Sequence, residues 1–226
     1  MHALIALALI SASPARVGGD ADQPRGSDRV RSYVSQPRPR SARFLDHGDI
    51  AIGVAGGTPH VYRLDLRVGL FDHVSVGVTG HWLPGQRAPQ LWPVGAIAFW
   101  RFIGASNQVG FEVGAHYRPV LHPPVDPEQT FIPQTQFALG TMVVSAGPFS
   151  AGLDVGAAHV RIPVADPATP TAFDRRTVFG GGVFARIGTR RIGVSADALA
   201  ALSPEPLLVF ELMLDVRFGA FSERGI

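Results

Sequence analysis

The chain has 226 residues, including 26 Gly and 19 Pro, and it contains neither Cys nor Lys. The absence of Cys excludes disulfides and thiolate metal sites, and the abundance of Gly and Pro favours turns and strands over helices. The net charge of +2 is unevenly spread, because residues 1–45 carry seven Arg and three Asp whereas residues 46–226 carry thirteen Arg and fifteen acids. The basic excess therefore belongs to an N-terminal tail and does not indicate a nucleic-acid-binding domain.

Residues 1–15 predict a signal peptide for export. Ala3 to Ile10 form a short apolar core, and Ser13-Pro14-Ala15 offers small residues for cleavage. A basic residue before the core is missing, so a short buried helix or a mis-assigned start codon is the alternative. No later window is continuously apolar for the roughly 18 residues that a transmembrane helix needs.

Residues 16–45 are rich in Arg, Ser, Pro and Gly. A segment of this composition cannot bury enough apolar surface to fold alone, which predicts a disordered basic arm. After Asp46 the pattern changes to short alternating runs separated by turn residues. We therefore expect one all-β domain over residues 46–226.

About ten runs alternate between apolar and polar residues, as half-buried strands do. The run from Trp92 to Phe102 is ambiguous because Ile97 and Phe99 break the alternation, and the Gly-rich run from Phe179 to Ile187 is weak. The expected strands lie near 48–56, 60–70, 73–83, 91–102, 107–119, 131–146, 149–162, 174–188, 191–202 and 206–221.

The last run, Leu207 to Phe218, carries the clearest pattern. One face holds only apolar residues, Leu208, Phe210, Leu212, Leu214, Val216 and Phe218, while the other holds Glu211, Met213, Asp215 and Arg217. An apolar face of this length suits a strand that crosses a bilayer better than a strand of a soluble sheet.

The connections between the expected strands differ in length. Several are tight, such as Phe71-Asp72 and Gly147-Pro148, whereas residues 83–90, 120–130 and 163–173 form longer, Pro-rich loops. Tight turns at one end and longer loops at the other are typical of outer-membrane barrels.

Aromatic residues gather near the ends of the expected strands. If successive strands reverse direction, two aromatic belts form, as expected where amphipathic rings sit at the headgroup level of a membrane. The belt at the long-loop end comprises Tyr62, Trp82, Trp92, Tyr117 and Phe131, and the belt at the tight-turn end comprises Trp100, Phe102, Phe149, Phe218 and Phe221.

Over residues 47–221 these patterns resemble the small outer-membrane β-barrels of Gram-negative bacteria. The resemblance implies a closed antiparallel transmembrane β-barrel of about ten strands, with eight as the alternative, located in the outer membrane among its lipids and lipopolysaccharide. The final strand also resembles the signal that the barrel-assembly machinery recognises, with Phe218 or Phe221 as its aromatic, although residues 222–226 follow here. A soluble secreted barrel or sandwich is the competing fold.

In a membrane barrel the polar face of each strand lines the lumen. Ten strands enclose little more space than their own side chains fill, so we expect the mixed charges to pair and to plug the barrel. The basic arm could also fold back into the lumen, since its charge is opposite. The expected network comprises Arg63, Asp65, Arg67, Glu112, His116, Arg118, Asp154, Asp197, Glu211, Asp215 and Arg217.

These features predict a structural, envelope or surface-binding role, with a narrow channel for ions or small solutes as the alternative. A lipid hydrolase using loop residues such as His122 is a third hypothesis. His122, Asp126 and His159 have no nucleophile beside them, so no catalytic site is assigned. The scattered His residues predict no metal site, and we expect no cofactor and no nucleic-acid partner.

Overall fold

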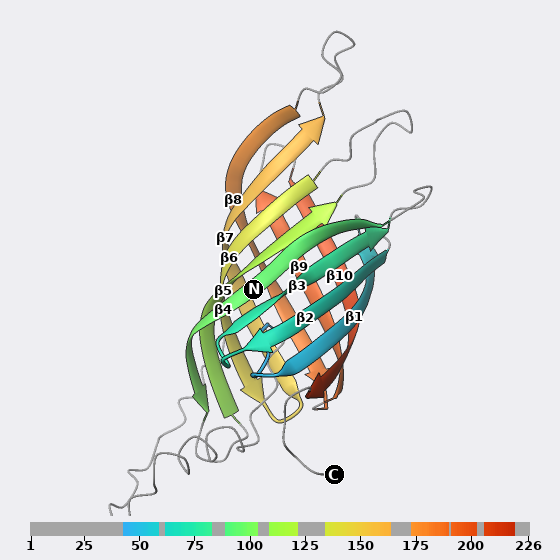
Figure 1. Cartoon of the computed structure of the whole chain (residues 1–226). Coiled ribbons are helices and arrows are strands. Elements are labelled where there is room, and N and C mark those ends of the chain that lie inside the picture. Colours follow the sequence, from blue (N-terminus) through green and yellow to red (C-terminus); the bar gives the residue numbers. More distant parts are fainter. Residues whose placement is uncertain are drawn as a thin grey trace, which may run out of the picture. The chain divides into compact units, whose positions relative to one another are not determined.

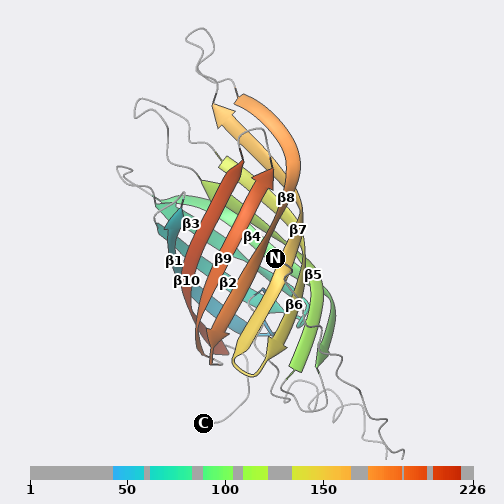
Figure 2. The same ribbon diagram turned by 180° about the vertical axis from the view of Figure 1, so that it is seen from behind.

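The computed structural model describes residues 43–58, 62–82, 89–103, 109–121, 134–163, 173–189, 191–202 and 206–219. In this part of the chain, ten antiparallel strands form a closed barrel in which sequential strands pair and β1 pairs with β10 (Figures 1 and 2). The strands are β1 (Asp49–Thr58), β2 (Tyr62–Leu70), β3 (Val74–Trp82), β4 (Gln90–Ile103), β5 (Val109–Leu121), β6 (Gln134–Ala146), β7 (Phe149–Pro163), β8 (Phe173–Gly188), β9 (Ile192–Leu202) and β10 (Leu207–Gly219).

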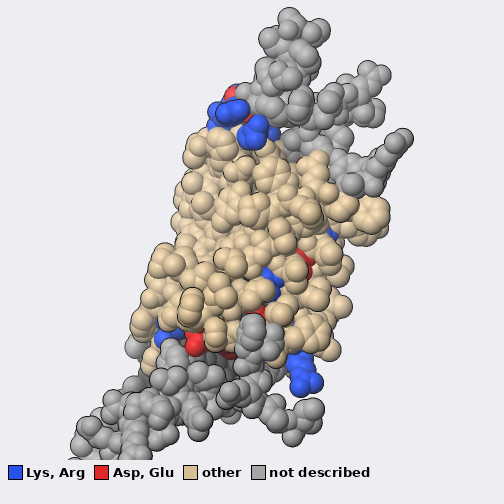
Figure 3. All heavy atoms as spheres, viewed as in Figure 1, with Lys and Arg blue, Asp and Glu red and all other residues tan. Residues whose placement is uncertain are grey.

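The barrel confirms the predicted fold with ten strands, and the alternative of eight is wrong. On β10, Leu208, Phe210, Leu212, Leu214 and Phe218 are between 50 and 63% exposed on the outer face, whereas the charged residues between them are buried in the lumen. A soluble barrel would turn its apolar face inward, so its arrangement is the reverse of this one. The wall in Figure 3 is accordingly almost free of charged atoms. The described residues include no helix that is long and apolar enough to cross a membrane.

A β-bulge explains why the alternation of β4 is ambiguous in the sequence. The register with β5 shifts between Ala98 and Trp100, which leaves Phe99 without a partner. An unpaired extra residue reverses the parity of the strand, so Phe99 and Trp100 are both exposed on the outer face. Arg101, which follows them, then turns into the lumen.

The strands extend to different heights at the long-loop end. The pairing of β7 with β8 continues to Pro163 and Phe173, whereas the pairing of β8 with β9 stops at Phe179 and Leu202. The β7–β8 hairpin therefore projects beyond its neighbours (Figure 1).

The N-terminal end of the described chain lies inside the barrel. Arg43, Phe44 and Leu45 are buried, although the basic arm was predicted to be disordered as far as residue 45. Two lumenal glycines leave room for this segment: a Cβ atom on Gly69 would lie 2.1 Å from the Asp46 carbonyl oxygen, and one on Gly114 would lie 2.5 Å from the Phe44 ring. Residues 43–45 thus fold with the barrel because they bury apolar surface there, while residues 1–42 lie outside the described chain.

The turn between β2 and β3 holds this segment at the tight-turn end. Phe71 and Asp72 both have positive φ angles, of 54° and 61°, as the two central residues of a mirror-image β-turn do, and the His73 amide closes this turn on the Leu70 carbonyl oxygen over 3.2 Å. The His47 amide donates to Asp72 Oδ1 over 2.7 Å, and the Phe71 amide donates to His47 Nδ1 over 3.0 Å. These two hydrogen bonds fix the chain where it leaves the lumen to enter β1.

Candidate functional site in the barrel lumen

The charged residues predicted to line the lumen all lie on the inner face of their strands. Cross-strand register places Arg63 and Asp65 of β2 opposite β1 residues that face inward, and the same alternation continues around the barrel. Arg67 is partly buried, whereas the other residues are buried: Arg63, Asp65, Glu112, His116, Arg118, Asp154, Asp197, Glu211, Asp215 and Arg217.

A cluster in the upper half of the lumen joins β2, β5 and β10. Arg63 lies 3.2 Å from Asp65 and 3.1 Å from Glu211, and Arg118 also donates to Glu211. Arg118 lies 3.7 Å from Asp197 on β9. Charges removed from water need partners of this kind, so the cluster links strands on different sides of the barrel.

Arg43 extends the network from the N-terminal segment. Its guanidinium contacts Asp154 on β7 and lies 2.6 Å from Asp197 on β9. The same group lies 4.0 Å from the centre of the Phe184 ring, in a cation–π contact. Arg43 therefore links the N-terminal segment to β7, β8 and β9.

A second cluster occupies the tight-turn end of the lumen. Arg186 donates two hydrogen bonds to Asp215, of 2.8 and 2.9 Å, and Arg217 donates a third to the same carboxylate over 2.8 Å. The two-pronged geometry of Arg186 and Asp215 is among the strongest that side chains form.

Arg101 ties three elements together at the same end. Its guanidinium lies 2.5 Å from Glu112 and 3.1 Å from Asp46, and it donates to the Asp72 carbonyl oxygen over 2.5 Å. The β2–β3 turn, the N-terminal segment and β5 thus share one cation.

Arg43, Arg101 and Arg186 are absent from the predicted network. The bulge hid the parity of Arg101, and Arg43 stood in a segment predicted to be disordered. Arg186 shares the lumenal face of β8 with Phe184, in a run whose glycines made the alternation weak. Regular alternation from Gly180 to Arg186 on the lumenal face was the one signal that could have identified it.

The lumen is not polar throughout. At the long-loop end, inward-facing apolar side chains pack into a buried cluster made by Val120, Phe137, Leu139, Ala158, Leu199, Ala201 and Val209. These side chains come from five strands and pack against one another at the long-loop end of the lumen. The cluster therefore fills the lumen beyond the charged network.

A small cavity remains beside the upper charge cluster. It has a volume of about 50 Å³ and is lined by residues that include Arg63, Arg67, His116, Arg118 and Asp197. A space of this size holds a few water molecules or one compact polar group.

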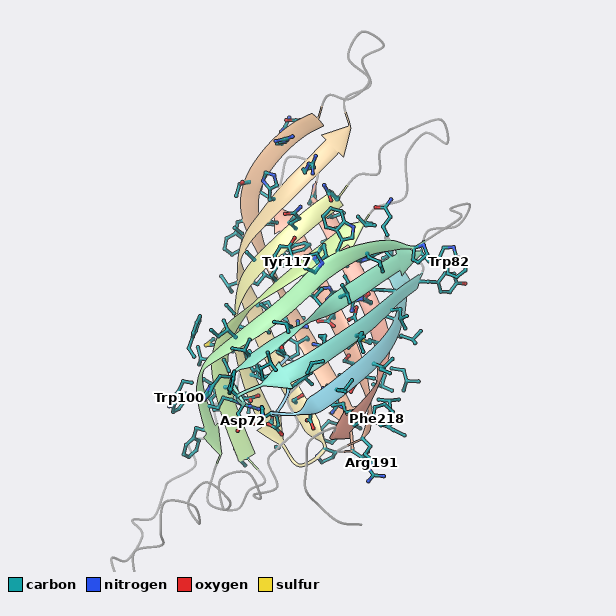
Figure 4. All side chains as sticks on the ribbon, in the orientation of Figure 1. Asp72, Trp82, Trp100, Tyr117, Arg191 and Phe218 are labelled. Carbon is teal, nitrogen blue, oxygen red and sulfur yellow. The ribbon has the colours of Figure 1, made fainter. Side chains whose placement is uncertain are left out.

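The predicted aromatic belts occupy two levels of the outer wall. In Figure 4, Trp82 and Tyr117 lie towards the long-loop end, and Trp100 and Phe218 lie towards the tight turns. Tyr62, Phe102 and Phe149 are likewise exposed on the outer face. Phe131 and Phe221 lie outside the described residues.

Trp92 does not belong to the outer belt. It stands opposite Thr79, a buried residue of the lumenal face, so its side chain lies on that face too. The bulge in β4 accounts for the error, because it reverses the parity of the strand between Trp92 and Trp100.

The described residues show no constellation for catalysis or metal binding. His159 Nδ1 lies 3.2 Å from Thr177 Oγ1 on an exposed surface, and no carboxylate of the described residues pairs with this histidine. His122 and Asp126 lie outside the described chain. Within the described chain, no three His, Cys, Asp or Glu residues gather as metal ligands do.

No family model and no curated protein matches the chain. Among solved structures, it is similar to the N-terminal β-barrel domain of Pseudomonas aeruginosa OprF, with 10% sequence identity and a TM-score of 0.29, over 77% of this chain and 100% of that one. So distant a likeness carries no argument about this chain.

Proposed function

We propose that the chain is an outer-membrane β-barrel, exported by the segment at residues 1–15. The exposed apolar wall, the two levels of aromatic residues and the closed sheet support this placement, because lipid cannot satisfy the backbone groups of an open edge. Cell fractionation and gel mobility before and after boiling test it. A product found only in the soluble periplasmic fraction would overturn it.

We further propose that the lumen of the barrel is blocked to ions and solutes, and that the protein has a structural or surface-binding role. One observation carries this proposal: Arg43, Phe44 and Leu45 are buried within the lumen, where Arg43 joins the charged network. The apolar cluster at the long-loop end supports it, since water and ions enter neither dense apolar packing nor satisfied ion pairs readily.

Planar-bilayer recording of the purified barrel separates this function from the channel alternative. We expect no stable conductance from the wild type. Steady conductance whose ion selectivity changes in Arg67→Ala and Asp215→Ala would instead establish a channel lined by the network.

A surface-binding role would use the outer rim and the loops at 83–90, 120–130 and 163–173. The projecting β7–β8 hairpin carries Arg175 and Arg176, which are exposed. Exposed guanidinium groups suit the phosphates of lipopolysaccharide, the partner that we propose for this rim. Binding of lipopolysaccharide should weaken when both residues are changed to Gln, and unchanged binding would remove the rim from consideration.

A further inference from the structure

The wall of the barrel contains a seam between β4 and β5. Their ladder ends at Gly95 and Tyr117, although both strands continue towards the long-loop end. Beyond this point, residues 90–94 pair only with β3 and residues 118–121 pair only with β6. The two strands are therefore neighbours without a ladder over the outer part of the wall.

Two prolines explain why the ladder stops. Continuing the register past Gly95 and Tyr117 would set Pro93 directly opposite Pro119. The Ala98 amide donates to the β3 side, to the His73 carbonyl oxygen over 2.6 Å. Backbone groups alternate in direction along a strand, so those of Ile97, and of Pro93 four residues earlier, point towards β5.

The same reasoning applies to β5. Because Ile97 faces β5 and stands opposite Ala115, the two form a hydrogen-bonded pair, and the backbone of Ala115 faces β4. Pro119 lies four residues later and faces β4 as well. The backbone nitrogens of both prolines therefore point into the seam, and neither carries a hydrogen. Their absence as donors prevents the two strands from pairing here, and it also means that no N–H group of these two residues is left unsatisfied in lipid.

The small cavity lies in the lumen beside the last pair of this ladder, Gly95 and Tyr117. Its lining includes Tyr117, whose side chain lies on the outer face, together with the lumenal residues Arg63, Asp197 and Met213. The cavity therefore reaches the point where the β4–β5 ladder ends. In Figure 3, charged atoms are visible in the middle of an otherwise uncharged wall.

One cation beside the cavity has no carboxylate partner among the described residues. Arg43, Arg63 and Arg118 pair with Asp65, Asp154, Asp197 and Glu211, whereas Arg67, which also lines the cavity, forms no ion pair with a described carboxylate. Neither ring nitrogen of the buried His116 has a hydrogen-bond partner, although Nδ1 lies 3.8 Å from Asp154. Within the described chain, the buried Nε of Arg67 also has no hydrogen-bond partner.

We propose that the seam is a lateral binding site for an anionic amphiphile with a compact head group, such as a fatty acid. The head group occupies the cavity of about 50 Å³ near Arg67 and His116, and the acyl chain lies along the seam between the exposed Leu91 and the half-buried Tyr117. A sugar-sized head group exceeds this space. The proposal rests on the membrane placement given above.

Binding of oleate to the full barrel in nanodiscs tests the proposal, with oleyl alcohol as the neutral analogue and lysophosphatidate as a second compact anion. We expect saturable binding of oleate or of both anions, and at least about tenfold weaker binding of the alcohol. Arg67→Gln should weaken anion binding about tenfold, whereas Arg191→Gln, the same change at an exposed residue of the tight-turn end, should leave it unchanged.

The double variant Pro93→Val/Pro119→Val restores both missing amides and should close the seam. We expect it to lose binding while gel mobility before and after boiling still shows a folded barrel. Equal binding of oleate and oleyl alcohol, or wild-type binding by both Arg67→Gln and the double variant, would overturn the site. If the double variant does not fold, the comparison of Arg67→Gln with Arg191→Gln decides alone. Failure of the membrane placement would appear separately, as a barrel absent from the membrane fraction.

Discussion

Pro93 of β4 and Pro119 of β5 would stand directly opposite each other if the ladder between their strands continued one pair of hydrogen bonds past Gly95 and Tyr117. Residues at such a position exchange two N–H to O=C hydrogen bonds, and proline can donate neither of them. The covalent structure of both strands therefore explains why the ladder ends here, and fraying of a strand end is not needed to explain it.

Amide hydrogen exchange tests this arrangement directly. Leu91 and Leu121 have the same parity as the two prolines, so their amides point into the seam, whereas the amides of Trp92 and Val120 point towards β3 and β6. We expect the seam amides to exchange at least about tenfold faster, because ladder hydrogen bonds protect the others. NMR of the barrel in micelles measures all four, and equal protection would contradict the seam.

Removal of the Arg43 guanidinium should destabilise the barrel. Arg43→Gln leaves the buried carboxylates of Asp154 and Asp197 without their closest cation, which should cost about 3 kcal/mol in the free energy of unfolding. Arg191→Gln is the matched control, since Arg191 is exposed at the tight-turn end (Figure 4). Urea unfolding followed by tryptophan fluorescence measures both variants, and equal stabilities would mean that the N-terminal segment is not fastened in the lumen.

Arg186 and Asp215 should behave as one unit in a double-mutant cycle. Asp215→Leu should lower the free energy of unfolding by about 3–5 kcal/mol, because it leaves Arg186 and Arg217 without their shared carboxylate. Arg186→Met should lower it by less, because Arg217 still pairs with Asp215. The double variant should lose less than the sum, by about 1–3 kcal/mol. Additive losses would show that the two side chains do not interact in the folded barrel.

Two glycines of neighbouring strands should differ in their tolerance of a methyl group. A Cβ atom at Gly114 would lie 2.2 Å from the Ile97 carbonyl oxygen and 2.5 Å from the Phe44 ring, whereas one at Gly140 would meet nothing closer than 3.4 Å. We expect Gly114→Ala to lower the melting temperature through a loss of about 1–3 kcal/mol, and Gly140→Ala to change it little. Similar melting temperatures would indicate that Phe44 does not pack on Gly114.

The sequence predicted the lumenal network well where alternation was regular. Arg63, Asp65 and Arg67 on β2, and Glu211, Asp215 and Arg217 on β10, lie on the inner face as expected. The prediction failed at Trp92 and omitted Arg101, because one extra residue in β4 reverses the parity between them. The amino-acid composition of β4 does not reveal a bulge, so the sequence alone leaves the alternation from Trp92 to Phe102 ambiguous.

The sequence by itself determined which residues of each regular strand share a face, because side chains alternate with period two whatever the strand pairs with. Only the tertiary structure decided which residues meet. Arg43 reaches Asp154 across 111 positions of sequence, and only the closure of the barrel brings them together. The bulge at Phe99 likewise shifts the register of β4 against β5 by one residue, and that shift is what sets Pro93 opposite Pro119.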